Sequence, residues 1–312
     1  MFVGIDVGGT NLKAGLVDGS GKLLAAARRP LCGFTGAKAF AADLAELALQ
    51  AVAEGGARVE ELEAVGIGMP GAVDGGNVLF TPNIPIENVP LERLFRQHLD
   101  IPVYLGNDAD CAAVGEFFGG AGRGFQDFVV VTLGTGIGAG IILGGKLRGG
   151  LASSEAGHMV IQQGGEQCNC GRRGCWERYA SATALIQQTR SAMEANPDSG
   201  LYQAAQALGA VDGRTAFQAA LAGDETALAV CRQYVEYLAD GTASLINVLR
   251  PEAVAIGGGV AAAPEELLLE PLRQIVGREC YARHGGRSTR ILRAELGNDA
   301  GIIGAALLGR VQ

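Results

Sequence analysis

Two strand–turn–strand patterns, each built around a glycine-rich turn, constrain the fold of this chain more than any other feature. The first covers residues 2–17 with its turn at 6–11, and the second covers residues 129–143 with its turn at 134–138. Apolar residues lead into and out of each turn, which is typical of two antiparallel strands. Because the pattern recurs along the chain, it predicts an internally duplicated architecture.

The rest of the chain supplies helices and further strands for a two-domain α/β protein. Its 312 residues correspond to two domains of about 150 residues each. Hydrophobic residues make up 48% and charged residues 19%, which is enough for a sizeable core. Since no low-complexity linker separates the halves, we expect two domains that share a cleft. The expected helices span 37–53, 181–195, 225–248 and 299–308, and the expected strands span 64–67, 103–105 and 253–256.

The net charge and one long uncharged segment limit which partners and which compartment we expect. The net charge of −8 argues against nucleic acid or an anionic membrane as the main partner. Residues 128–145 carry no charge over 18 residues, the lower limit of a membrane span. Six of them are glycine and their apolar groups form two short blocks, so two buried strands fit better than a membrane helix. Without a signal peptide, we expect a soluble cytoplasmic protein that has no membrane partner.

Both glycine-rich turns are candidate phosphate-binding loops. Glycines let successive backbone N–H groups approach a phosphate, and Thr10, Thr135 and Lys13 add side-chain donors. Neither turn fits the P-loop or the G-x-G-x-x-G pattern. Either turn alone is more typical of an ordinary hairpin, but two turns in matching contexts favour phosphate binding. Asp6, at the end of the first strand, suits a water-mediated contact to phosphate-bound Mg²⁺, or it simply initiates the turn.

A polar segment follows the strand expected at 103–105 and precedes an apolar, helix-like run. Asn107 or Asp108 stands at the helix N-terminus, and capping explains one of the two. The helix dipole keeps a carboxylate ionised at this position, so that it can accept a proton. Asp110 points away from Asp108 on a helix, so at most one of the two faces a site at the strand end.

Three cysteines and one histidine have the spacing of a metal site. Cys168, Cys170 and Cys175 follow a C-x-C-x4-C pattern, and His158 lies ten residues upstream. These four ligands suit tetrahedral zinc, and because no coordination position stays open, the zinc would be structural. Unmetallated buried thiols are the alternative. In a chain of seven cysteines without a secretory signal, the cluster favours a metal over disulfides.

Two glutamates flank this motif. Glu155 precedes His158 by three residues, and Glu177 follows Cys175 by two. Metal binding would draw both carboxylates toward the imidazole, and carboxylates accept hydrogen bonds from adjacent hydroxyls, which suits a polyol ligand. Either glutamate alone is more typical of a solvated surface charge.

In their order along the chain, these segments resemble the motifs of the ROK-family sugar kinases, and within the family most those of the bacterial glucokinases. The similarity runs from the first strand to the terminal helix. The similar segments are DVGGTNLK at 6–13, GMPG at 68–71, TPN at 81–83, GNDA at 106–109, GTGIG at 134–138, SEAGH at 154–158, the cysteine segment at 168–177, and RPE to GGG at 250–259.

The resemblance implies an actin-like or hexokinase-like ATPase fold of the α/β class, with two domains, a duplicated β-sheet core and an interdomain cleft. The smaller N-terminal domain would cover residues 1–110, and the larger C-terminal domain, which carries the zinc-binding loop, residues 111–298. The terminal helix, at 299–312, would pack back on the first domain. Family members are usually dimers or tetramers, so the resemblance implies a homodimer or a homotetramer.

The resemblance also implies transfer of the ATP γ-phosphate to the 6-hydroxyl of glucose, with Mg²⁺ and a structural Zn²⁺. Asp108 would be the general base, and His158 would bind zinc through one ring nitrogen and face the sugar with the other. The residues implied to bind the sugar are Asn83, Asn107, Asp108, Glu155, His158 and Glu177. Those implied to hold the nucleotide are Asp6, Gly8, Gly9, Thr10, Asn11, Lys13, Gly134, Thr135, Gly136, Gly138, Gly257, Gly258 and Gly259.

Alternatives to a glucose kinase concern the acceptor and the class of protein. N-acetylglucosamine, N-acetylmannosamine or another hexose would need a differently shaped pocket. A sugar-responsive ROK repressor carries a helix-turn-helix before the first phosphate motif, whereas here that motif begins at Asp6, so we do not expect a repressor. A nucleic-acid-binding zinc knuckle would depend on Arg172 and Arg173, which is a weak basis in a chain of net charge −8.

Overall fold

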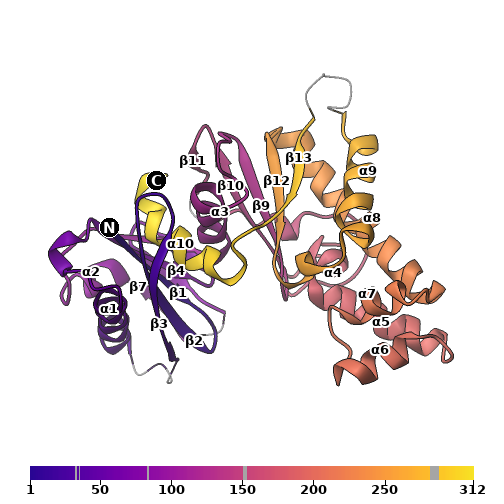
Figure 1. Cartoon of the computed structure of the whole chain (residues 1–312), viewed down its shortest axis with the longest axis horizontal. Coiled ribbons are helices and arrows are strands. Elements are labelled where there is room, and N and C mark those ends of the chain that lie inside the picture. The colour runs from indigo at the N-terminus through magenta and orange to yellow at the C-terminus, as the bar shows by residue number, and fades with distance from the viewer. Residues whose placement is uncertain (32–33, 35, 83, 150–152, 282–287) are drawn as a thin grey trace. The chain divides into compact units, whose positions relative to one another are not determined.

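The computed structural model describes residues 1–312 apart from 32–33, 35, 83, 150–152 and 282–287 (Figure 1). These residues form two compact units. Unit 1 comprises Met1–Val130, Ala139–Ser154 and Ala294–Gln312, and unit 2 comprises Val131–Gly138 and Glu155–Arg293. The domain limits expected from the sequence, 1–110 and 111–298, stay a prediction.

Unit 1 is built on a five-stranded mixed sheet (Figure 1). Its strands are β1 (Phe2–Val7), β2 (Asn11–Val17), β3 (Leu23–Pro30), β4 (Ala64–Met69) and β8 (Val103–Asn107). They lie in the order β3-β2-β1-β4-β8. β1 and β2 form the antiparallel hairpin that the N-terminal pattern predicts. β3 adds a third antiparallel strand that was not predicted, and β4 and β8 are added in parallel.

One face of this sheet packs through side chains. Val3 and Ile5 alternate along β1 onto this face and are fully buried. They share a core cluster with the apolar side of α1 (Ala37–Glu54), including Leu44 and Ala48. The alternating residues of the strand thus pack on the apolar side of the helix.

On the other face of the sheet, a helix packs so closely that backbone atoms make the contacts. Gly15, Gly4 and Gly66 lie in register on three adjacent strands, and α10 (Ala300–Leu307) crosses them. A Cβ built at Gly4 would lie only 1.8 Å from the carbonyl oxygen of Ile302. These glycines therefore allow the helix backbone to touch the sheet, which no larger residue permits.

A second five-stranded sheet repeats the arrangement of the first. Its strands are β9 (Phe128–Leu133), β10 (Ile137–Leu143), β11 (Lys146–Leu147), β12 (Ala253–Gly257) and β13 (Arg290–Arg293). Their order is β11-β10-β9-β12-β13, so each strand takes the place of its counterpart in the first sheet. The expected duplication is confirmed, because the two sheets have the same strand order and each contains one of the two hairpins.

Helices and a small sheet complete the structure. The remaining helices are α2 (Leu91–Phe95), α3 (Asp108–Gly119), α4 (Glu177–Ala180), α5 (Ala182–Ala195), α6 (Leu201–Leu208), α7 (Thr215–Leu221), α8 (Glu225–Leu249) and α9 (Leu269–Glu279). A three-stranded antiparallel sheet contains β5 (Ala72–Asp74), β6 (Asn77–Phe80) and β7 (Glu87–Val89).

The helices and strands expected from the sequence are confirmed, with ends that differ by a few residues. The uncharged stretch at 128–145 forms β9 and β10, because its glycines interrupt the apolar blocks. Within the part of the chain that the structure describes, no helix combines the length and the apolar character needed to cross a bilayer.

Candidate functional site

The first glycine turn, at the β1–β2 connection of unit 1, closes on itself. The N–H of Gly8 donates to the carbonyl oxygen of Asn11 at 2.9 Å, and the Asn11 amide donates to the Thr10 hydroxyl at 3.0 Å. Gly9, Thr10 and Asn11 are exposed at the tip. The predicted nucleotide residues of this turn therefore lie together on the surface of unit 1.

Asp6 and Lys13 face each other across the β1–β2 pair. They are register partners, and the Lys13 ammonium lies 3.7 Å from the Asp6 carboxylate. Burial raises the pKa of Asp6, and attraction to Lys13 offsets part of that rise. The backbone of Gly301 in α10 packs against the same carboxylate. Asp6 is thus a partly buried acid with incomplete counter-charge, an environment that a divalent cation would stabilise.

Asn107 and Asp108 stand where β8 ends and α3 begins. Asn107 is the N-cap, because its side-chain oxygen accepts from the N–H of Ala109 at 2.8 Å. Its side-chain amide donates to the carbonyl oxygen of Gly71 at 2.9 Å. Asp108 is exposed at the first helical position, whereas Asp110 is only 4% exposed. The structure therefore presents one carboxylate at this strand end and buries the other.

His158, Cys168, Cys170 and Cys175 come together in unit 2 as the spacing predicts. Their ligand atoms all lie within 4.8 Å of one another. Cys168 Sγ lies 3.6 Å from His158 Nδ1, and the Sγ atoms of Cys170 and Cys175 are 3.6 Å apart. Zinc with tetrahedral bonds of about 2.3 Å places two sulfurs about 3.8 Å apart. The cluster is consistent with a zinc site.

Two glycines shape the loop that carries the cysteines. The thiols of these cysteines differ in pKa. Gly171 and Gly174 have φ of 90° and 85°, the region that favours glycine, and they curl the chain around the cluster. Burial raises the pKa of Cys168 to about 12, while the backbone N–H of Arg172 lowers that of Cys170. Since a metal binds thiolates, its binding would release protons from these sulfurs.

Glu155 and Glu177 flank the histidine. A carboxylate oxygen of Glu155 lies 3.8 Å from Nε2 of His158, and one of Glu177 lies 3.8 Å from Nδ1. Glu177 also accepts a hydrogen bond from Cys168 Sγ at 3.2 Å. Nδ1 therefore faces the cysteines, and Nε2 faces Glu155. Two carboxylates and one imidazole nitrogen gather beside the metal ligands, and all three can bind hydroxyl groups.

The second glycine turn, at residues 134–138, lies next to this group. A Cβ built at Gly136 would lie 2.5 Å from a carboxylate oxygen of Glu177, so the turn approaches that glutamate closely. Gly258, with φ of 84°, packs against the backbone of Leu133 just before the turn. The turn and the segment 257–259 therefore adjoin within unit 2, whereas Gly138 is already part of β10. Asn83 lies outside the described residues.

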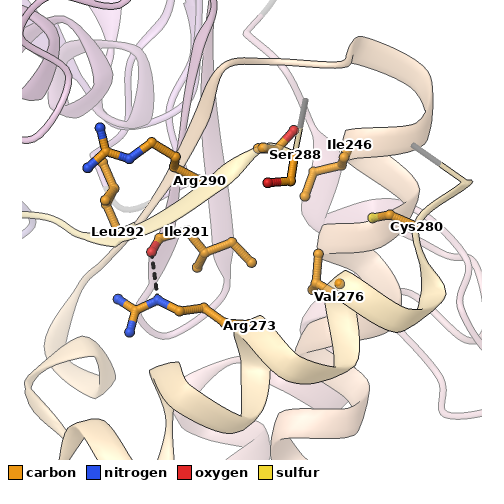
Figure 2. A pocket seen from close by; sticks show the side chains of 10 residues that line it. Ile246, Arg273, Val276, Cys280, Ser288, Arg290, Ile291 and Leu292 are labelled. Carbon is orange, nitrogen blue, oxygen red and sulfur yellow. Dashed lines mark hydrogen bonds between the residues drawn. The ribbon is translucent and has the colours of Figure 1, made fainter. Parts of the chain in front are cut away.

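A pocket of about 480 Å³ opens elsewhere in unit 2 (Figure 2). Ile246, Val276 and Ile291 line it, and Arg273 Nε at its side donates to the carbonyl oxygen of Ile291 at 2.9 Å. It borders the beginning of β13, whereas residues 257–259 follow the end of the parallel strand β12. None of the predicted site residues that the structure describes lines this pocket.

Sequence reasoning missed two residues that hold predicted site residues in place. Gly71 anchors Asn107 through its carbonyl oxygen, and its φ of 107° and the carbonyl of Phe80 beside it leave no room for a side chain. Thr183 donates its hydroxyl to the carbonyl oxygen of Thr135 at 2.8 Å. Gly71 stood within a motif that was noticed, but no local pattern in the sequence pointed to Thr183.

Comparison with known proteins gives consistent results along the whole chain. A model of the ROK family matches residues 2–311. The glucokinase of Thermotoga maritima is 39% identical, and the match covers 98% of this chain and 96% of the relative.

Solved structures of ROK family proteins are also similar to this chain over nearly its whole length. A ROK family glucokinase from Streptomyces griseus in complex with glucose and AMPPNP is 36% identical, with a TM-score of 0.79 over 99% of both chains. The ROK hexokinase from Thermus thermophilus is 36% identical, with a TM-score of 0.82 over 98% of this chain and 97% of the other. The predicted actin-like ATPase fold with a duplicated sheet core is confirmed, and it contains two mixed five-stranded sheets.

Proposed function

Because this chain belongs to the ROK family and is a sugar kinase like its similar relatives there, we propose that it transfers the γ-phosphate of ATP to the 6-hydroxyl of glucose. The relative from Thermotoga maritima is named a glucokinase, and the one from Streptomyces griseus binds glucose and AMPPNP. The observation that carries the proposal is the cluster of Glu155, His158 and Glu177 beside a four-ligand metal site and a glycine turn.

Backbone amides of the two glycine turns would hold the phosphates. In unit 1 this role falls to Gly8, Gly9, Thr10 and Asn11, with the side chain of Lys13 as a further donor. In unit 2 it falls to Gly134, Thr135, Gly136 and Gly138, with Gly257, Gly258 and Gly259 toward the adenosine. Mg²⁺ carried by ATP would neutralise phosphate charge. Asp6 would hold it through water, and the cation would add to the counter-charge that Lys13 gives this partly buried carboxylate.

Asp108 would act as the general base. As the sugar oxygen bonds to the γ-phosphorus and the bond to the ADP oxygen breaks, the hydroxyl proton passes to the Asp108 carboxylate. It stands at the first position of the twelve-residue helix α3, where the helix dipole favours a negative charge. The N-cap bonds of Asn107 hold the backbone beside it.

Carboxylates and amides would orient the sugar. Glu155, Glu177 and Nε2 of His158 would bind hydroxyls in unit 2, and Asn107 would do so in unit 1. The resemblance adds Asn83 to this set. Asn107 keeps capacity for this, because an amide has two N–H donors and two lone pairs, and the bonds to Gly71 and Ala109 use one of each. Zinc on Nδ1 of His158 would fix the ring so that Nε2 stays directed to the substrate.

The acceptor is tested with a coupled ADP-release assay over a panel of hexoses. We expect the highest kcat/KM with glucose, lower values with mannose, and the lowest with N-acetylglucosamine and N-acetylmannosamine. A preference for either N-acetyl sugar would replace glucose as the proposed acceptor. Light scattering on the same preparation tests whether the chain forms the proposed homodimer or homotetramer.

The base is tested with Asp108→Asn. We expect kcat to fall by roughly 10²–10⁴-fold, the range for loss of a general base, while the Kd for glucose changes little. Asp100→Asn, which alters an acid of unit 1 whose side chain is 84% exposed, is the control and should keep full activity. An Asp108→Asn enzyme with more than a tenth of the normal kcat would exclude the role.

A further inference from the structure

We infer that Thr183 positions the second glycine turn for nucleotide binding. The inference concerns one short segment, residues 177–183, which we call the strut, and it rests on the proposed role of residues 134–138 in holding phosphate. Thr183 lies at the far end of the strut from Glu177. It is outside all the motifs described above.

The near end of the strut is tied to the metal ligands and to α8. Glu177 accepts a hydrogen bond from the Cys168 thiol at 3.2 Å. Trp176, directly before the strut, is fully buried against Gly241 and donates its indole N–H to the carbonyl oxygen of Tyr237 at 2.8 Å. This end therefore has little freedom to move along α8.

The middle of the strut is also held by α8 and by the start of α5. The buried hydroxyl of Tyr234 donates to the carbonyl oxygen of Ala180 at 2.8 Å. Ser181 caps α5, since its hydroxyl accepts from the N–H of Ala184 at 3.1 Å. The backbone that presents Ala182 and Thr183 is thus fixed by bonds that do not involve the turn.

The far end of the strut binds two consecutive carbonyl groups of the turn. The N–H of Ala182 donates to the carbonyl oxygen of Gly134 at 2.9 Å, and the hydroxyl of Thr183 donates to that of Thr135 at 2.8 Å. Both bonds come from one turn of α5. The first uses backbone and survives any substitution other than proline, whereas the second depends on a side chain.

Peptide planarity converts these two bonds into the direction of two amides. In a trans peptide the C=O of one residue and the N–H of the next point in opposite directions. Holding the Gly134 carbonyl against the strut directs the Thr135 N–H away from it, and holding the Thr135 carbonyl does the same for Gly136. Two successive N–H groups turned to one side are the arrangement that binds a phosphate oxygen. Thr183 therefore sets the direction of the Gly136 amide.

The experiment compares Thr183→Val with Thr183→Ser. Valine keeps the shape and loses the hydroxyl, while serine keeps the hydroxyl and loses the methyl group. Calorimetric titration with ATP and Mg²⁺, without any sugar, should show roughly three- to tenfold weaker binding for Thr183→Val, the effect of one neutral hydrogen bond. Thr183→Ser should bind ATP within about twofold of the wild type. The KM for glucose and the zinc content should match the wild type in both variants.

The possible outcomes distinguish failure of this inference from failure of the glucose proposal. Equal ATP affinity for valine and wild type, or equal weakening by valine and serine, would overturn the inference, because the hydroxyl would then have no part. A larger rise in the KM for glucose than in the Kd for ATP would also overturn it. If the wild type binds ATP but phosphorylates a different hexose, the glucose proposal fails and the inference stands. A wild type that binds no ATP would overturn both.

Discussion

The two hairpins of this chain share a pattern of residues and differ in what supports their turns. Each turn has one internal bond, from Gly8 to Asn11 in the first and from Gly134 to Gly136 in the second. The first turn is held from outside by the N–H of Leu31, just after β3, which donates to the carbonyl oxygen of Thr10. The second turn is held from outside by α5, which binds the carbonyls of Gly134 and Thr135, and its Gly136 lies against Glu177 beside the His–Cys cluster. A repeated sequence pattern thus specifies the path of the backbone, while each copy takes its support from different parts of the chain.

The strands next to the turns show the same contrast. Below the first turn, glycines at 4, 15 and 66 bring the backbone of α10 against the sheet. In β10, which follows the second turn, a Cβ at Gly140 would meet the carbonyl oxygen of Ala109 in α3 at 2.6 Å. Both hairpins accept a helix on a glycine, but only the second turn is also coupled to a metal cluster. Perturbing the metal and perturbing the glycines should therefore affect different hairpins.

Removal of zinc should have the largest effect and should act on the second hairpin. Elemental analysis should find one zinc per chain, and chelation or Cys175→Ser should lower the free energy of unfolding of unit 2 by about 5 kcal/mol or more. Hydrogen exchange should accelerate in the peptide covering 134–138 and stay unchanged in the peptide covering 6–13.

A control separates the metal from the loss of a buried thiol. Cys280→Ser removes a buried cysteine outside the cluster, so the zinc content should stay at one per chain. A metal-free protein with the stability of the wild type would contradict the zinc prediction.

Substitution of Gly66 should have the next largest effect and should act on the first hairpin. In Gly66→Ala the new Cβ would lie 1.6 Å from the carbonyl oxygen of Ala305, so α10 must move off the sheet. We expect a loss of about 3 kcal/mol in urea unfolding, with exchange accelerating in the peptide covering 6–13.

The matched control is Gly277→Ala in α9, where a Cβ meets no atom within 4 Å. This variant should gain up to about 1 kcal/mol, because alanine is the better helix former. If Gly66→Ala unfolds at the urea concentration of the wild type, close packing of α10 on the sheet is wrong.

A change at Asp6 should have the smallest effect and should depend on pH. Thr132 stands at the matching place before the second turn, so only the first hairpin has this carboxylate. Burial raises the pKa of Asp6, so its ionised form destabilises the fold. This cost is absent below the pKa of unfolded aspartate, about 3.9, and develops as the pH rises through the higher pKa of the folded state.

Asp6→Asn removes that cost. Relative to the wild type, the variant should gain about 1 kcal/mol or less between about pH 4 and about pH 7, measured by thermal unfolding without Mg²⁺. A stability difference that stays constant with pH, or shrinks as the pH rises, would show that Lys13 compensates the buried charge fully.

Much of the fold and of the metal cluster was predictable because the relevant contacts are local. The hairpins, the long helices and the ligand set of His158 with Cys168, Cys170 and Cys175 depend on periodicity and on spacings of a few residues. The structural roles of the glycines were predictable only in part. Turn glycines were recognised from their neighbours, but nothing beside Gly4 or Gly66 in the sequence indicates that a helix some 240 or more residues away packs on them.

By itself, then, the sequence determined which segments form strands and helices, the duplication of the hairpin, and the cluster of one histidine and three cysteines. Only the tertiary structure decided that Gly71 anchors Asn107, that Glu177 touches both a thiol and a glycine turn, and that Thr183 binds the carbonyl of Thr135. The physical reason is distance along the chain. Hydrophobic period and loop chemistry act within a few residues, whereas a hydrogen bond between segments tens of residues apart exists only once strands and helices have set their register.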